Sequence, residues 1–333
     1  MLLRELGPIT AGSTPLDYAE APDPVVGLGQ VLIRVTACGV CHTELDEVEG
    51  RTAPPRLPII PGHQVVGVVV EGGTPGQRVG VAWIHSACGE CEYCVSGNEN
   101  LCQQFRATGR DVDGGYAQFM IADAAFVHVI PESLSDSEAA PLLCAGAVGY
   151  RALKLSKISD GLNLGLTGFG ASNHLVLKTA RHLYPRSKVF VFSRNLEERR
   201  LAMEIGAAWA GAFDETPPEP LQAVIDATPA WLPVTQALLH LAPGGRLVVN
   251  AIRKEEGDKE ALRTLDYTRH LWLEKELKTV ANVTRRDVRE FLQLAAEAGI
   301  KPEVQEYDLK DANQALLDVK QGKIRGAKVL RGM

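Results

Sequence analysis

The segment "LNLGLTGFGASNHLVLKTARHL", residues 162–183, joins an apolar run, a glycine-rich turn and a stretch with helical spacing. Gly165, Thr167 and Gly170 fit the pattern G-x-G-x-x-G, with Thr167 in the place of the central glycine and Gly168 directly after it. Glycines let the backbone approach a pyrophosphate, and the helix N-terminus attracts its charge. The predicted dinucleotide site is formed by Gly165, Thr167, Gly168, Phe169, Gly170 and Ala171.

The chain around this segment alternates predicted strands and helices. The predicted strands are "KVFVF", "LQAVIDAT", "RLVVNAI" and "LKTVANV", and the predicted helices between them are "NLEERRLAMEIGA" and "TQALLHL". Strands that alternate with helices form right-handed units on a parallel sheet. We therefore expect an α/β chain that contains a doubly wound Rossmann domain.

The first 130 residues differ from this pattern. "GQVLIRVTA" places Val31, Ile33 and Val35 on one face, and "VVGVVV" and "RVGVAWI" are further β-branched runs between glycines. This periodicity predicts an antiparallel, barrel-like β region.

Composition excludes several classes of protein. The 333 residues are 45% hydrophobic and 23% charged, with a net charge of −6, whereas nucleic-acid binding needs clustered Lys and Arg. The longest apolar run, residues 65–70, is too short to cross a bilayer. The N-terminal "MLLRELG" has Arg4 and Glu5 where a signal peptide needs apolar residues. We expect a cytoplasmic enzyme without nucleic-acid or membrane partners.

Six of the seven cysteines lie in two clusters, which indicates metal binding in a reducing compartment. "CGECEYCVSGNENLC" has the spacing C-x2-C-x2-C-x7-C, and four thiolates complete a tetrahedron around a structural zinc. An iron–sulfur cluster is the competing interpretation, but the spacing differs from the common ferredoxin patterns. Glu90, Glu92 and Glu99 make the lobe acidic, unlike a nucleic-acid-binding zinc ribbon. The predicted structural zinc ligands are Cys88, Cys91, Cys94 and Cys102.

The second cluster, "TACGVCHTELD", holds Cys38 and Cys41, and its spacing alone fits a redox pair, a metal site or neither. Together with the zinc lobe, "CGVCHTEL", "PGHQVVG", "DVDGGYAQF", "PLLCAGAVGYRAL" and "GLTGFGASNH" resemble the zinc-dependent, medium-chain alcohol dehydrogenases over essentially the whole chain. The resemblance implies reversible hydride transfer between a primary or secondary alcohol and NAD(P), two zinc ions per chain, and a homodimer or homotetramer. It also implies a GroES-like, β-rich catalytic domain at 1–145 and 284–333 with a zinc lobe at 84–106, and a Rossmann domain at 146–283.

The same resemblance assigns the catalytic zinc to Cys41, His63 and Cys144, and leaves Cys38 as a buried thiol. Three protein ligands leave a fourth position free for water or alcohol. Two residues close to these ligands in the sequence differ from the family pattern. Glu44 replaces the Asp that accepts the other N–H of the ligand histidine, and Gln64 replaces a Glu. Gln64 thereby removes one negative charge near the metal.

Thr43 matches the hydroxyl that takes the alcohol proton, and Asp46 stands where relatives have a histidine that accepts it. A solvated surface charge is the alternative for Asp46. His42 matches a basic position that contacts the pyrophosphate. Ser193 and Arg194 follow the second strand where NAD-specific folds place an acid, which favours NADP because Arg194 can pair with a 2′-phosphate. The alternative is that Arg194 stacks on adenine and NAD is used.

Two other functions remain open. A zinc-ribbon interaction protein would account for the four-cysteine lobe alone. A zinc-independent quinone or enone reductase shares the implied fold but generally lacks Cys41, His63 and Cys144.

Overall fold

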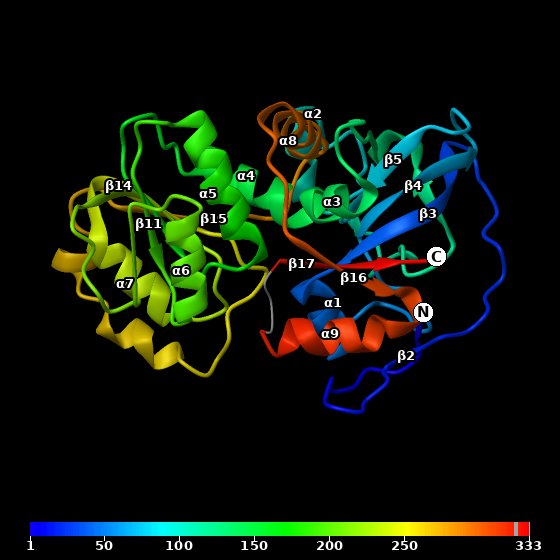
Figure 1. Ribbon diagram of the computed structural model, residues 1–333, viewed down its shortest axis with the longest axis horizontal. Helices are drawn as coiled ribbons and strands as arrows, with labels where there is room; N and C mark the ends of the chain where they lie inside the picture. Colours follow the sequence, from blue (N-terminus) through cyan, green and yellow to red (C-terminus); the bar gives the residue numbers. More distant parts are fainter. Residues whose placement is uncertain (323–325, 333) are drawn as a thin grey trace. The chain divides into compact units, whose positions relative to one another are not determined.

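The computed structural model describes residues 1–322 and 326–332, and it divides the chain into two compact units (Figure 1). Unit 1 comprises Met1–Ala147 and Asn282–Met333, and unit 2 comprises Val148–Ala281. The junctions thus fall after residues 147 and 281, close to the boundaries after 145 and 283 that we expect from the sequence.

Unit 2 contains a six-stranded parallel sheet in the order β12-β11-β10-β13-β14-β15. The chain leaves β10 toward β11 on one side and returns to β13 on the other, so the strand order reverses between β10 and β13. Its elements are α4 (Ala147–Leu155), β10 (Leu164–Thr167), α5 (Ala171–Leu183), β11 (Val189–Phe192), α6 (Leu196–Glu204), β12 (Trp209–Gly211), β13 (Leu221–Asp226), α7 (Leu232–His240), β14 (Leu241–Val249), η4 (Lys259–Thr264), η5 (Tyr267–Leu271) and β15 (Glu276–Thr279).

Apolar clusters cover both faces of this sheet. On β11, Val189 and Val191 pack into one cluster, whereas Phe190 and Phe192 pack into the other. Alternate residues of a strand point to opposite faces, so a strand buried on both sides reads as a continuous apolar run. The predicted α/β, doubly wound parallel sheet is confirmed.

Unit 1 contains a seven-stranded sheet in the order β16-β17-β3-β4-β5-β9, with β8 paired to β3. Figure 1 shows β17, in red, beside β3, in blue, so the two ends of the chain build one sheet. The pairs are antiparallel except β16–β17, which are parallel because α9 connects them. The sheet strands are β3 (Gln30–Val40), β4 (Gln64–Glu71), β5 (Arg78–Val81), β8 (Phe119–Asp123), β9 (Val127–Val129), β16 (Val304–Asp308) and β17 (Ala327–Arg331).

Helices and short elements complete unit 1 around an apolar core that includes Ile33, Val35 and Leu330. They are β1 (Leu2–Leu3), β2 (Leu16–Asp17), α1 (His42–Val48), β6 (Ile84–Ser86), α2 (Glu92–Val95), η1 (Glu99–Leu101), β7 (Arg106–Ala107), η2 (Ala124–Phe126), α3 (Asp136–Pro141), η3 (Leu142–Gly146), α8 (Arg285–Ala298), η6 (Leu309–Asp311) and α9 (Ala312–Lys320). In the described part of the chain, no helix combines the length and apolar character that crossing a membrane requires.

Candidate active site and metal centres

The start of α1 fixes two side chains of the site. Cys41 is the N-cap residue of α1, and its Sγ accepts a hydrogen bond from the backbone N–H of Thr43 at 3.3 Å. Glu44 reaches back, and its Oε2 accepts the backbone N–H of Cys41 at 2.9 Å. This reciprocal capping box holds both side chains in place at the end of β3.

Three potential metal ligands meet beside this helix start. Cys41 lies at the junction of β3 and α1, His63 directly precedes β4, and Cys144 lies in η3. Their donor atoms all lie within 4.8 Å of one another, and Cys41 Sγ is 3.7 Å from His63 Nε2. Two sulfurs and one imidazole make three protein ligands for zinc and leave a fourth position open.

Glu44 determines how His63 is presented. Its Oε1 lies 2.5 Å from His63 Nδ1, and both side chains are buried. Burial works to lower the pKa of His63 and to raise that of Glu44, but their mutual attraction outweighs it and moves both pKa values in the opposite directions. The Nδ1–H of His63 is thereby held toward the carboxylate, and Nε2 is directed at the ligand cluster.

The donor set itself fits a divalent cation. Without one, a hydrogen bond to Cys144, burial and the charge of Glu44 raise the pKa of Cys41 well above its ordinary value. A bound cation reverses this, because a coordinated thiol is deprotonated. Nearby, burial and the charge of Glu44 also raise the pKa of the buried Glu47 carboxyl, a residue that the sequence patterns did not single out.

Cys144 lies in a π-helical turn, which is wider than an α-helical turn. Residues 142–146 form a π-helical turn between α3 and α4, a feature that often marks functional sites. Gly146 packs directly on α8, and a Cβ added there would lie 2.2 Å from Cε1 of Phe291. The position of Cys144 therefore depends on contact with a helix from the C-terminal part of the chain.

The four-cysteine lobe brings its predicted ligands together within one loop. The sulfurs of Cys88, Cys91, Cys94 and Cys102 lie within 4.8 Å of one another. Backbone N–H groups point at these sulfurs, including Cys91 N to Cys88 Sγ at 3.3 Å and Gln104 N to Cys102 Sγ at 3.3 Å. Hydrogen bonds from the backbone of Glu90 and Cys91 lower the pKa of Cys88 to about 6. A closed set of four sulfurs is typical of structural zinc.

The lobe is attached to α8 through Glu99. Its Oε1 accepts the backbone N–H of Arg285 at 2.9 Å and the guanidinium Nε of Arg285 at 3.1 Å. The same guanidinium lies 4.6 Å from the ring centre of Phe126. The first residue of α8 is thus bonded to the lobe.

The other residues predicted in unit 1 lie near the ligands along the chain. Thr43 is half-buried and His42 is exposed. Asp46 is only 4% exposed, and its Oδ1 accepts Arg51 Nε at 2.5 Å, so the alternative of a solvated surface charge is wrong. Gln64 is buried, and its Nε2 has no hydrogen-bond partner among the described residues. Cys38 is a buried free thiol on β3 and does not belong to the ligand cluster.

The glycine-rich turn lies at the carboxyl end of β10 in unit 2. Thr167 ends β10, Gly168 has a φ of +74° that favours glycine, and Gly170 is the N-cap residue of α5. Gly165 packs on β13, where an added Cβ would lie 2.7 Å from Leu221 Cδ1. Phe169 is buried, and Ala171 begins α5.

The end of β11 carries the predicted cofactor-selecting residues. Ser193 is buried, and its hydroxyl donates to Glu198 Oε2 at 2.5 Å. Arg194 is exposed and makes no hydrogen bond or ion pair within residues 1–322 and 326–332. The sequence patterns missed Glu198, because its carboxylate comes from α6 rather than from the strand end.

Comparisons with known proteins agree with this geometry. Residues 27–132 match the alcohol dehydrogenase GroES-like domain family. The probable alcohol dehydrogenase AdhA of Mycobacterium tuberculosis (strain CDC 1551 / Oshkosh) is 41% identical, over 98% of this chain and 95% of its own length. An alcohol dehydrogenase of Geobacillus stearothermophilus is 34% identical over 95% of each. The cobalt- and zinc-bound thermostable alcohol dehydrogenase from Pyrobaculum aerophilum has a TM-score of 0.83 and 25% identity, covering 100% of both chains.

Proposed function

Because the chain belongs to the zinc-dependent, medium-chain alcohol dehydrogenase family and is itself an NAD(P)-dependent alcohol dehydrogenase, we propose which residues perform the reaction. The substrate is a primary or secondary alcohol, which is oxidised reversibly to the aldehyde or ketone. The convergence of Cys41, His63 and Cys144 is the observation that carries this proposal.

Zinc, when bound by these three ligands, supplies Lewis acidity that favours the alkoxide over the alcohol. Thr43 accepts the alcohol proton at its hydroxyl and passes it on toward Asp46. These two residues are three apart on α1 and therefore share one face of the helix. The Arg51 guanidinium holds the Asp46 carboxylate in position, and Glu44 keeps His63 Nε2 directed at the zinc.

The cofactor binds on the glycine-rich turn of unit 2, with its pyrophosphate at the N-terminus of α5, and the family pattern assigns a further pyrophosphate contact to His42. We favour NADP because Arg194 is exposed and has no ion-pair partner among the described residues, and because Ser193 replaces the expected acid. The carboxylate of Glu198 argues in the other direction, but the Ser193 hydroxyl already donates to it.

The test measures kcat/KM for both cofactors across a panel of alcohols and aldehydes, together with zinc content. We expect two zincs per chain and a preference for NADP that falls at least about tenfold in Arg194→Ala, since a bidentate guanidinium contact is lost. Arg200→Ala is the matched control, because Arg200 is exposed on α6 but already paired with Glu197. A tenfold preference of the wild type for NAD would contradict the NADP assignment.

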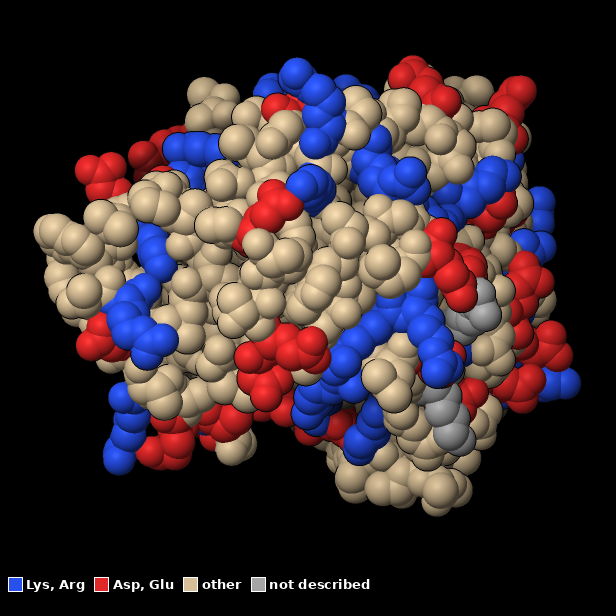
Figure 2. All heavy atoms as spheres, turned by 60° about the vertical axis from the view of Figure 1, so that its left-hand side comes forward, with Lys and Arg blue, Asp and Glu red and all other residues tan. Residues whose placement is uncertain are grey.

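We also propose a homodimer or homotetramer in the cytoplasm, assembled through unit 2. The edge strand β15 is exposed along its whole length, and the exposed Tyr267, Trp272 and Leu273 precede it. Figure 2, turned so that the left-hand side of Figure 1 comes forward, shows broad areas without Lys, Arg, Asp or Glu between charged side chains of both signs. Light scattering after size-exclusion chromatography tests the assembly, and a monomer would contradict it.

A further inference from the structure

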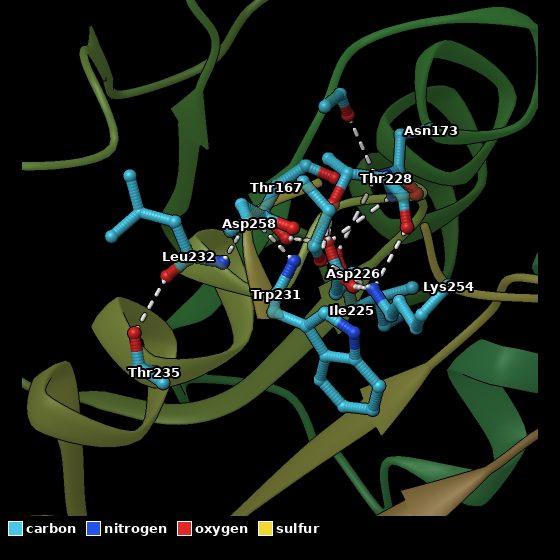
Figure 3. Close-up of polar contacts among 12 residues, drawn as sticks. Thr167, Asn173, Ile225, Asp226, Thr228, Trp231, Leu232, Thr235, Lys254 and Asp258 are labelled. Carbon is cyan, nitrogen blue, oxygen red and sulfur yellow. Dashed lines mark hydrogen bonds and ion pairs between the residues drawn. The ribbon is translucent and has the colours of Figure 1, made fainter. Parts of the chain in front are cut away.

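A buried ion pair lies beside the glycine-rich turn at the point where the strand order of unit 2 reverses. Asp226 ends β13 and pairs in register with Thr167, the last residue of β10. Ligands of doubly wound sheets bind outside the carboxyl ends of the strands at such a reversal. Figure 3 shows Asp226 and Lys254 at the centre of a network that includes Thr167, Asn173 and Thr228.

Asp226 is fully buried, and its carboxylate is saturated with donors. Its Oδ1 accepts Thr167 Oγ1 at 2.6 Å, Thr228 Oγ1 at 2.8 Å and the backbone N–H of Thr228 at 3.2 Å. Its Oδ2 accepts the ammonium of Lys254. Charge-assisted hydrogen bonds of this kind are the strong ones, and burial makes the loss of either partner costly.

Lys254 links two segments that follow neighbouring strands. It comes from the segment after β14, and its Nζ also donates to the backbone carbonyls of Thr228 at 2.8 Å and Ala230 at 3.0 Å, both after β13. An ammonium has three donors, so all of those of Lys254 are used within the protein. The side chain is 9% exposed and therefore does not bind a ligand directly.

A second contact joins the same two segments. Asp258 Oδ2 accepts the backbone N–H groups of Trp231 and Leu232, both at 2.8 Å. These N–H groups lie at the start of α7, whose N-cap Trp231 provides no capping side chain of its own. Lys254 and Asp258 together fix the path of residues 227–232.

Residues 227–232 in turn support the glycine-rich turn. A Cβ added to Gly168 would lie 2.8 Å from Thr228 Cγ2, so the two segments are in direct contact. From the other side, Asn173 Nδ2 donates to the carbonyls of Gly168 at 2.8 Å and Thr167 at 3.1 Å. Thr167 takes the place of the central glycine in the G-x-G-x-x-G pattern. Its hydroxyl donates to Asp226 and so joins the glycine-rich turn to this carboxylate.

We propose that Asp226 and Lys254 are positioning residues for the dinucleotide: their ion pair holds the turn in the geometry that receives the pyrophosphate. The proposal rests on the cofactor site proposed above. It also accounts for Thr167, since a hydroxyl at this position gives the turn a direct bond to the buried carboxylate. Because the pair acts on the pyrophosphate region, it affects NAD and NADP alike.

The test compares Lys254→Met with Arg246→Met in the zinc-loaded enzyme. Arg246 is the matched control, because it is buried and paired with Glu276 at the amino end of the same sheet. In Lys254→Met we expect Kd and KM to rise about tenfold for both NADH and NADPH, measured by fluorescence titration and kinetics, while kcat changes less than about threefold, since only positioning is lost. In Arg246→Met we expect a lower Tm with unchanged cofactor binding.

Two further variants keep the inference testable if Lys254→Met folds poorly. Lys254→Arg retains the charge and donors, so we expect most of the binding to return. Thr167→Val removes only the hydroxyl, and we expect a rise in Kd smaller than that of Lys254→Met. Unchanged Kd in Thr167→Val and Lys254→Met, or equal losses in Lys254→Met and Arg246→Met, would overturn the inference. Failure of the wild type to bind either dinucleotide would instead count against the proposed cofactor site.

Discussion

The two zinc sites of unit 1 are built in opposite ways. The four ligands of the lobe come from one 15-residue stretch, Cys88 to Cys102, whereas Cys41, His63 and Cys144 come from three elements far apart in the sequence. The lobe can gather its sulfurs locally. The catalytic set exists only when β3, β4 and η3 have reached their final positions.

The two zinc sites also differ in how their surroundings shift the pKa values of the cysteine ligands. In the lobe, backbone N–H groups lower the pKa of Cys88 to about 6, whereas burial and hydrogen bonds to the other three cysteines raise the pKa of Cys94 to about 12. At the catalytic site, Cys144, burial and Glu44 raise the pKa of Cys41. Zinc therefore meets one stabilised thiolate in the lobe, whereas at the catalytic site it must displace the proton of a buried Cys41 thiol that is hydrogen-bonded to Cys144. A site of the second kind retains its metal only while its surroundings are intact.

The largest expected effect separates the two sites outright. His63→Ala removes the imidazole ligand, so zinc content should fall from two per chain to one, and kcat/KM should fall about 10³-fold or more, because zinc supplies several kcal/mol of transition-state stabilisation. Elemental analysis and steady-state kinetics measure both. His85→Ala serves as control, since His85 is buried but belongs to neither ligand set. Two retained zincs in His63→Ala would refute the assignment.

A ligand change in the lobe should have the reverse pattern. Cys91→Ser should lose the other zinc and lower Tm by about 10 °C, because structural zinc binding contributes to folding free energy. The kcat of the folded fraction should stay within about twofold of the wild type, since a closed site does not contact substrate. Calorimetry and active-site titration measure this, and a loss of kcat without a loss of Tm would show that the lobe is catalytic.

A smaller effect sharpens the role of Glu44. Glu44→Gln keeps the size of the side chain but removes the charge opposite His63 Nδ1, so zinc affinity or kcat/KM should fall about 10- to 100-fold. Glu44→Asp, which restores the acid of the family pattern, should retain more activity than Glu44→Gln. Chelator competition at the catalytic site measures the affinity. A smaller loss in Glu44→Gln than in Glu44→Asp would show that side-chain length, not charge, matters here.

The smallest effect concerns the attachment of the lobe to α8. Glu99→Gln weakens two bonds to Arg285 and should lower the free energy of unfolding by about 1 kcal/mol, with both zincs retained. Glu92→Gln is the control, because Glu92 is an exposed lobe residue at the start of α2. Denaturant unfolding of both variants measures the difference, and identical stabilities would mean that the Glu99 contact is energetically neutral.

The contrast between a site built from one stretch and a site built from distant segments also explains what the sequence could predict. The spacing of the lobe cysteines and of residues 165–170 is local, so these residues indicated their sites without a structure. Cys41, His63 and Cys144 needed the family resemblance, because no local pattern connects them. Lys254 and Asp226 were missed for the same reason: their pairing depends on how the segments after β13 and β14 cross. The parallel pairing of β16 and β17 was also missed, since it depends on the path of α9.

Because residues 142–146 form a π-helical turn, the position of the Cys144 sulfur depends on the exact number of residues between α3 and α4. Each α-helical residue advances about 100° around the helix axis, and a π turn holds one residue more than an α-helical turn. Deleting a single residue between α3 and α4 would therefore rotate one side of the turn relative to the other and carry the sulfur of Cys144 away from His63. An exposed loop tolerates insertions and deletions, whereas we expect this segment to tolerate substitutions only.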